Sequence, residues 1–297
     1  MVPRPARRVR AAARTHALTA PSQPFDAEGL TPSLTCQYGL GMDPHANPDG
    51  YAPAASRAAA SRDTPWVIEP DAALPSVPLH PAPWQLHGWA YMLVVRLPDD
   101  MLDSAAFVPA DWVPKRRTRT AIVLFVDYET SPCGPYRELL VAPAAFDLGQ
   151  GSHPAISRIF VSTYDSVVNG RNNWGIPKDR ADFEVVRDPA RHTDRLRLSR
   201  DGHTFAELEL RSRGPALPVR TGLLPPGIRT LVQSWQGKAY RTKLAARGKA
   251  RLASLASWRF DPEYFPDLSR GRVLVASHFP DFDMTFPVAD VASRENA

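Results

Sequence analysis

Short segments in which apolar and polar residues alternate run through the chain from Trp84 onward. In the segment DRLRLS, Leu196 and Leu198 are placed to face one side of a strand, while Arg195 and Arg197 face the other. Other segments are rich in β-branched and aromatic residues and are separated by turn signals such as SPCGP. The pattern predicts strands over residues 89–97, 119–130, 136–146, 157–168, 181–188, 194–199, 204–214 and 272–279.

Few segments favour helix by the same criteria. Residues 99–107 predict a short helix, whereas Pro114 interrupts another candidate. Residues 243–258 are the segment most compatible with a helix, and residues 230–244 fit strand at least as well. Because the strands are short, regularly spaced and mostly without helices between them, we predict a mainly β fold (a β-rich α+β chain). Its antiparallel sheet closes into a barrel or folds as a sandwich.

The first 75 residues differ in composition from the rest. They are rich in Ala, Arg and Pro and hold no apolar period long enough to bury a face. We therefore expect a disordered or loosely structured extension over residues 1–75 and one folded domain over residues 76–297. The Arg-rich, acid-poor start also fits an organellar presequence, with a flexible extension or a misassigned start codon as alternatives.

The net charge of +5 excludes few classes of function, because the N-terminal segment supplies much of the excess positive charge. One dense basic cluster lies in the folded part, KRRTR, residues 115–119. It is either a solvated loop or the rim of a site for a partner or an anionic substrate. No basic face with interleaved aromatic residues is evident, so we expect no nucleic-acid partner. No apolar run approaches the length of a membrane span, so we expect no membrane partner either.

Cysteine and histidine usage gives no indication of disulfides or metal sites. The two cysteines, Cys36 and Cys133, fit a reducing compartment, and we expect a cytoplasmic protein. The eight histidines are scattered singly, without the spacing of metal ligands. Cys133 lies in the SPCGP turn with no histidine nearby in sequence, which favours a small buried turn residue over a nucleophile.

Two motifs in a fixed order carry most of the functional information. SPCGPYRELL, residues 131–140, is followed by SRIFVSTYDSVVNGR and then by WGIPK, residues 174–178. Together with the opening PWQLHGWAYMLVVR, this arrangement resembles the acetoacetate decarboxylase family, roughly from Trp84 to Val291. The resemblance implies a closed, barrel-like antiparallel sheet, a small-molecule keto-acid substrate and a homo-oligomer, with no metal or organic cofactor.

By this resemblance Lys178 corresponds to the family's Schiff-base lysine and Glu138 to its active-site glutamate. A β-keto acid loses CO2 readily only when the departing electron pair has a sink. An iminium formed between an amine and the ketone is such a sink. The amine must be unprotonated to attack, and burial in an apolar pocket disfavours the charged form of a lysine. A carboxylate beside it is suited to orient the amine or to move protons.

Aromatic and aliphatic residues near the motif lysine are candidates for the walls of a dry pocket. Trp174, Ile176 and Phe183 are the first of these, with ordinary core residues as the alternative. Tyr136 lies two residues before Glu138 on an alternating strand, so the two side chains are expected to face the same side.

Two arginines are candidates for binding the substrate. If residues 178–182 are extended, Arg180 shares a face with Lys178, where it could bind a carboxylate or crowd the amine. The alternative is an ordinary surface charge. Arg171 matches an arginine of the family pattern, and a structural ion pair is an equally suitable interpretation.

Several positions depart from the family pattern. Asp179 stands where many members have a second lysine, and a carboxylate touching the amine would favour its charged form. Asn172 and Asn173 replace an acidic and an apolar residue, while Val123 and Gly88 fall where an acid and an arginine are usual.

From the resemblance we expect a Schiff-base lyase acting on a β-keto acid. An aldolase-dehydratase using the same lysine, or a barrel that binds small molecules without catalysis, is the alternative.

Overall fold

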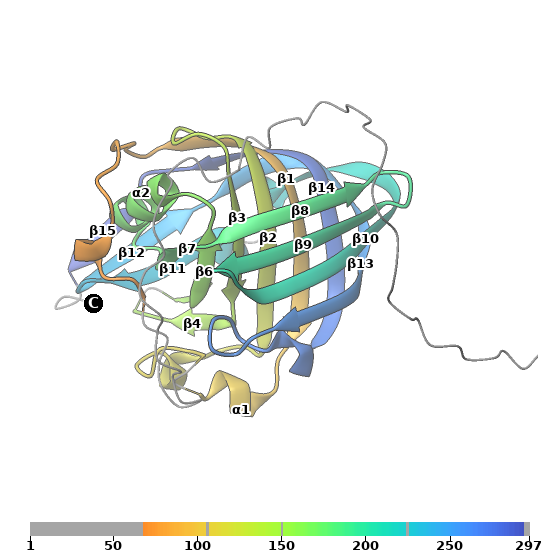
Figure 1. Ribbon diagram of the computed structural model, residues 1–297. Coiled ribbons are helices and arrows are strands. Elements are labelled where there is room, and N and C mark those ends of the chain that lie inside the picture. Colours follow the sequence, from red (N-terminus) through yellow and green to blue (C-terminus); the bar gives the residue numbers. More distant parts are fainter. Residues whose placement is uncertain (1–67, 105–106, 150, 224–225, 294–297) are drawn as a thin grey trace, which may run out of the picture. The chain divides into compact units, whose positions relative to one another are not determined.

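The computed structural model describes residues 68–104, 107–149, 151–223 and 226–293 of the chain (Figure 1). Its largest element is a sheet of ten strands. The expectation of disorder over residues 1–67 lies outside the described residues. In sheet order the strands are β7 (Lys178–Arg180), β6 (Arg158–Val161), β3 (Tyr136–Ala142), β2 (Thr120–Thr130), β1 (Trp84–Arg96), β14 (Arg272–Phe286), β13 (Ala245–Phe260), β10 (His203–Arg220), β9 (Thr193–Arg200) and β8 (Asp182–Asp188).

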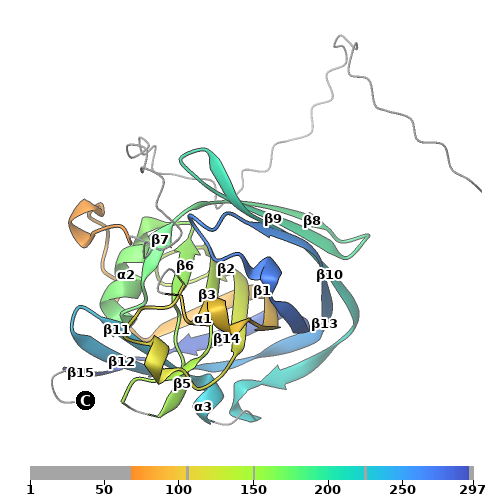
Figure 2. The same ribbon diagram turned by 90° about the horizontal axis from the view of Figure 1, so that it is seen from below.

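The ten strands curl round into a nearly closed barrel, as Figure 2 shows. Neighbouring strands are antiparallel except β6 and β7, which pair in parallel. The strands at the two ends of the order, β7 and β8, are separated in the chain by Ala181 alone. The expected mainly β fold with a barrel-like, largely antiparallel sheet is confirmed.

A second layer covers part of the outer face of the barrel. It contains the helix α2 (Tyr164–Trp174) and a sheet of β11 (Thr230–Trp235), β12 (Lys238–Lys243) and β15 (Asp290–Ser293), seen together in Figure 1. Two further strands, β4 (Ala145–Asp147) and β5 (Ser152–Pro154), pair with each other.

Alternation along the strands divides the apolar residues between two cores. On β3, Leu139 and Val141 belong to the core inside the barrel, while Tyr136 and Leu140 belong to the core between the barrel and the second layer. Successive side chains of a strand point to opposite faces, so the same strands line both cores. The outer core is rich in aromatic residues, including Trp84, Tyr128, Tyr164, Trp174 and Tyr240.

The short helix predicted over residues 99–107 is present as α1 (Asp99–Leu102). Leu102 and the following Trp112 pack against the core inside the barrel, so this segment covers one end of it. The interruption expected at Pro114 is a 3-10 turn, Val113–Lys115. Another four-residue helix, α3 (Pro226–Arg229), precedes β11.

The strand predicted over residues 157–168 is correct only in its first part, because β6 ends at Val161 and α2 follows. The side chain of Thr163 accepts a hydrogen bond from an N–H in the first turn of α2 and caps the helix. Gly175 ends it in the left-handed conformation, with φ of 62°. These two caps outweigh the strand preference of Val167 and Val168.

The helix favoured over residues 243–258 is wrong. This segment forms most of β13, which pairs with β10 on one side and with β14 on the other. The helix propensity of an alanine-rich segment is worth only tenths of a kcal/mol per residue. Pairing with β10 along most of the strand, and with β14 over residues 245–252, overrides it. Residues 230–244, which fit strand equally well, form β11 and β12.

Residues upstream of the expected domain boundary also pack against the barrel. Glu69 is buried, and its backbone N–H donates to Asp179 Oδ1 at 3.0 Å. A 3-10 turn follows at Asp71–Ala73. The division at residues 75 and 76 stays a prediction, and these contacts show that Glu69 already packs against the barrel.

Large apolar side chains are exposed on three strands of the barrel sheet. Leu217, Leu252 and Leu274 are 62%, 63% and 43% exposed, on β10, β13 and β14. Side chains of this kind suit a contact between subunits. A homo-oligomer stays a prediction.

One histidine is buried inside the barrel without a polar partner. His278 stacks on Tyr91 with ring centroids 4.5 Å apart, and neither ring nitrogen has a hydrogen-bond partner among the described residues. Burial, together with the nearby Arg251 and Arg187, lowers the pKa of His278 from 6.5 to about 4.

We predict that His278 makes the fold less stable in acid. In the unfolded chain this side chain binds a proton below about pH 6.5, and in the folded chain only near pH 4. Stability should therefore fall as the pH drops from 6.5 toward 4, by about 3 kcal/mol from this group. Urea unfolding of the wild type and of His278→Phe at a series of pH values measures it. Parallel stability curves for the two proteins would contradict the prediction.

Candidate active site

Lys178 is buried at the edge strand β7, with only 3% of its surface exposed. Its Nζ donates a hydrogen bond to Ser166 Oγ on α2 at 2.9 Å and lies 3.5 Å from Glu138 Oε2 on β3. The Tyr136 ring lies 5.0 Å from the same nitrogen. A lysine, a carboxylate and a hydroxyl from three separate elements therefore meet at one amine.

The side chain of Lys178 reaches this position because α2 carries a glycine opposite it. A methyl group added at Gly170 would lie 2.6 Å from Cδ and 2.7 Å from Cε of Lys178. Gly175 then reverses the chain after the helix, and its left-handed φ and close contact with Tyr240 exclude a side chain there. The two glycines place β7 beside α2 and let the lysine stem lie across the helix.

Glu138 is held on its second oxygen by a tyrosine. Tyr128 on β2 donates its hydroxyl proton to Glu138 Oε1 at 3.1 Å, and Glu138 itself is 5% exposed. Burial, followed by the charge of Glu138, raises the pKa of Tyr128 and of Tyr136 well above the ordinary value. Tyr128 consequently stays a hydrogen-bond donor and fixes the carboxylate, leaving Oε2 directed at the amine.

A cavity of about 30 Å³ adjoins the amine and the carboxylate. This volume holds one or two water molecules. Apart from Lys178 and Glu138, its walls are apolar or aromatic, and they come from β1, β2, β3, β6, α2 and β14. The lining residues are Trp84, Leu86, Tyr128, Tyr136, Glu138, Leu140, Ile156, Ile159, Trp174, Ile176, Lys178 and Phe286.

Asp179 lies on the opposite face of β7 from Lys178 and does not contact the amine. Its carboxylate is completely buried and pairs with Arg158 at 2.6 Å and with Arg171 at 3.2 Å. Arg200 lies 3.8 Å away and also pairs with Glu69. The carboxylate at the position of the usual second lysine therefore belongs to an ionic network behind the site.

The expected pocket walls are brought together in part. Tyr136, Trp174 and Ile176 line the cavity, whereas Phe183 packs against the core inside the barrel. Val123 is likewise in the barrel core, on the face of the sheet away from the amine.

Neither arginine expected at the substrate lines the cavity. Arg171 donates to the backbone oxygen of Lys178 at 3.0 and 2.7 Å and to that of Glu69 at 2.7 Å, which agrees with its structural interpretation. Arg180 pairs with Asp182 at 2.6 Å. Both guanidinium groups are thus bound to the protein itself, and their role toward a substrate stays a prediction.

Cys133 occupies a turn, as the sequence suggests, but it is half-buried and not fully buried. Its N–H donates to Ser131 Oγ at 3.2 Å, and burial raises the pKa of the thiol. Raising the pKa lowers the thiolate fraction, so the environment does not favour a nucleophile.

Residues that the sequence reasoning did not single out complete the site. Ser166 and Tyr128 contact Lys178 and Glu138, and Trp84 and Phe286 close the cavity. Tyr128 could have been found, because it lies opposite Tyr136 when β2 and β3 are aligned as a hairpin around SPCGP. Ser166 was missed because the sequence pattern of its segment was interpreted as a strand instead of the helix α2.

Chemically, the arrangement is an amine beside a fixed carboxylate within apolar walls. Such a site suits covalent bonding of a carbonyl compound to the amine, with proton transfer by the carboxylate. The described residues contain no group of three or more metal-ligating side chains. None of the helices described is both long and apolar enough to cross a lipid bilayer.

Residues 76–282 match the profile of the family described as acetoacetate decarboxylase (ADC). The chain belongs to the acetoacetate decarboxylase family. No curated protein compared with it matches in sequence. The family expected from the two motifs is thereby confirmed, over most of the span from which it was inferred.

Solved structures of acetoacetate decarboxylase type share the fold. The acetoacetate decarboxylase of Legionella pneumophila is 16% identical, with a TM-score of 0.54 over 79% of this chain and 98% of that one. An acetoacetate decarboxylase-like enzyme from Sphingomonas wittichii is 14% identical, with a TM-score of 0.54 over 72% and 94%. The enduracididine biosynthesis enzyme MppR, in complex with pyruvate, is 15% identical, with a TM-score of 0.52 over 73% and 93%.

We predict that Asp179 stabilises this member of the decarboxylase family strongly. Asp179→Asn removes the negative charge that the buried guanidinium groups of Arg158 and Arg171 share. This loss should lower the free energy of unfolding by about 3–5 kcal/mol. Asp182→Asn removes a half-exposed partner of Arg180 and should cost less than about 1 kcal/mol. Urea denaturation measures both, and equal small losses would show that the network does not support β7.

Proposed function

We propose that the protein is a lyase that forms a Schiff base between Lys178 and a β-keto acid and releases CO2. The observation that carries the proposal is the contact of a buried amine with a buried carboxylate inside apolar walls. Membership of the acetoacetate decarboxylase family supports the same reaction class.

In the proposed reaction Nζ of Lys178 attacks the ketone carbon, and loss of water gives an iminium. The bond between the carboxylate carbon and the α-carbon then breaks, and its electron pair moves into the iminium to form an enamine. Protonation of the enamine carbon restores an iminium, which water hydrolyses to free the ketone and the amine. No electron acceptor or donor from outside is needed.

Glu138 is the group placed to move protons in these steps. Oε2 faces the amine at 3.5 Å and can take its proton before attack, while Tyr128 keeps the carboxylate from turning. Ser166 Oγ, which accepts a hydrogen bond from Nζ at 2.9 Å, holds the amine on the other side. Both side chains orient the amine nitrogen of Lys178, and neither forms a bond to the carbonyl carbon of the substrate.

The apolar walls favour loss of CO2 over retention of the carboxylate. A carboxylate transferred from water into an apolar cavity is destabilised, and the CO2 that replaces it carries no charge. The arginines that could have neutralised a carboxylate are bound elsewhere, so their contact with substrate is not part of this proposal. A keto acid is larger than the present 30 Å³ cavity, so Trp84, Leu86 or Phe286 must shift to admit it.

Aldol condensation with dehydration is a second use of the same lysine. The solved structure of MppR with the condensation product of pyruvate and imidazole 4-carboxaldehyde motivates it, at 14% identity and a TM-score of 0.51. The enamine formed on Lys178 would attack an aldehyde carbon instead of taking up a proton. Binding without turnover is the third possibility from the sequence, and it predicts a bound keto acid with neither CO2 nor a covalent adduct.

We predict that borohydride traps the substrate on Lys178. Incubation with acetoacetate and borohydride, followed by intact mass spectrometry, should give an isopropyl adduct, which is the reduced imine of acetone. A carboxyl-bearing adduct would indicate imine formation without decarboxylation. Lys178→Met should abolish the adduct and Lys115→Met, on the protein surface, should retain it. Absence of any adduct, or equal labelling of Lys178→Met, would contradict the proposal.

We also predict that Gly170→Ala impairs the reaction without unfolding the protein. The new methyl group must displace the flexible stem of Lys178, which moves Nζ from Glu138, and such a misplacement should lower the trapping rate about 10- to 100-fold. Alanine is favoured over glycine in a helix by about 1 kcal/mol, so the melting temperature should change little. Gly222→Ala, where the added carbon meets nothing within 4 Å, is the control. Unchanged trapping in Gly170→Ala would refute the assigned geometry.

A further inference from the structure

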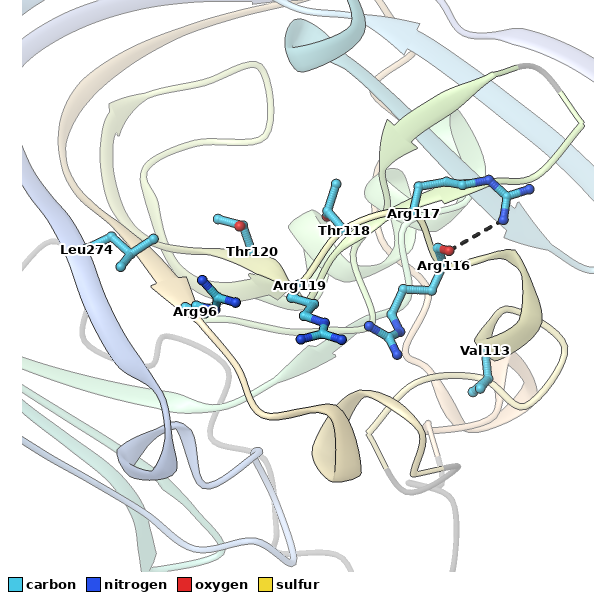
Figure 3. Close-up of a pocket in the computed structure, with 8 residues that line it drawn as sticks. All are labelled: Arg96, Val113, Arg116, Arg117, Thr118, Arg119, Thr120 and Leu274. Atoms are coloured by element: carbon cyan, nitrogen blue, oxygen red, sulfur yellow. Dashed lines mark hydrogen bonds between the residues drawn. The ribbon is translucent and has the colours of Figure 1, made fainter.

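A second hollow lies on the basic segment that the sequence left without a function. It is a cleft of about 460 Å³ at the end of β1 and the start of β2, shown in Figure 3. Its volume falls within the range typical of ligand pockets. The lining residues are Arg96, Val113, Arg116, Arg117, Thr118, Arg119, Thr120 and Leu274, none of which lines the cavity at Lys178.

The charged residues that line this cleft are all arginines. Arg96, Arg116 and Arg119 all line the same hollow, as Figure 3 shows. Carboxylates outside the lining contact three of them, since Arg116 pairs with Asp99 and Asp103, Arg119 with Asp99 and Arg117 with Asp147. One carboxylate, Asp99, is therefore shared between two arginines, and the cleft keeps an excess of positive charge.

Arg96 lines the cleft, and its cross-strand neighbour Arg272 lies outside the lining. Arg96 on β1 lies directly opposite Arg272 on β14 in the antiparallel register, and neither forms an ion pair within the described part of the chain. Like charges at directly opposed positions destabilise a sheet. An anion bound between them would remove this repulsion.

The basic segment is fixed by backbone hydrogen bonds and is not a loose loop. The N–H of Arg117 donates to Ala145 O at 2.9 Å, and Arg119 O accepts from Leu97 N at 3.1 Å. Thr118 Oγ accepts from Ala145 N at 2.9 Å. The backbone that carries the arginines is therefore in place before a ligand binds, which lowers the entropic cost of binding.

We propose that this cleft binds a small organic diphosphate. The guanidinium fork matches phosphate oxygens in pairs, and several arginines in a row suit two linked phosphate groups better than a single carboxylate. Val113 and the 43% exposed Leu274 provide apolar edges for the organic part. The concave shape suits a small molecule more than the flat face of a protein partner.

Isothermal titration of the full chain with inorganic pyrophosphate and with ADP tests this site. Both probes should bind saturably at one site per chain. Arg96→Gln should weaken binding at least about tenfold, since a hydrogen bond to a charged group is lost. The matched control is Arg247→Gln, which removes one exposed charge paired with Asp283 on the barrel surface and should bind as the wild type does.

Three outcomes would overturn the site. The first is that neither probe binds saturably. The second is that Arg96→Gln and Arg247→Gln weaken binding equally, which indicates an adventitious ion only. The third is that duplex DNA binds more tightly than ADP and that this binding depends on Arg96. Melting temperatures of both variants close to the wild type show that lost binding is not unfolding. Borohydride trapping at Lys178 should be unchanged in Arg96→Gln, so this site and the proposed lyase activity are tested separately.

Discussion

The buried carboxylate of Asp179 is the interaction on which the site depends. It receives the guanidinium groups of Arg158 and Arg171 and the N–H of Glu69, on the face of β7 turned away from the cavity. Adjacent residues of a strand point in opposite directions, so fixing Asp179 also fixes the direction of Lys178. An acid that departs from the family pattern thus supports the lysine without touching its amine.

On the cavity side the polar groups are concentrated at a single point. Lys178, Glu138, Ser166 and Tyr128 satisfy one another, while aromatic and aliphatic residues exclude water from the rest of the space. Burying an ion pair carries a desolvation penalty that apolar residues of similar volume would avoid. A site with this unfavourable feature, at the junction of β7, β3 and α2, is typical of function and not of stability.

A structural feature could be predicted from the sequence when the residues that determine it are close together in the chain. Alternation such as that of Leu196 and Leu198 identified most strands, because each side chain's face is set locally. Lys178 and Glu138 were found through two motifs, since neither residue alone differs from a surface charge. The failure at residues 243–258 came from a non-local cause, because two neighbouring strands pair with them. For Arg171 the sequence left two interpretations open, and its bonds to Glu69 and Asp179 agree with the structural one. The missed helix α2 was readable from Thr163 and Gly175.

The aromatic residues that line the cavity determine how a ligand reaches Lys178. The Trp174 ring packs edge-to-face against Trp84 and at a tilt against Phe286. Its indole N–H donates a hydrogen bond to Pro287 O, so the end of β14 helps to enclose the cavity. A ligand larger than two waters enters only when these rings move apart, and in the proposed reaction the ketone would leave by the same rearrangement. Exchange of a non-covalent ligand with solvent then depends on the mobility of three rings, and the water proposed to free the lysine would enter when they separate.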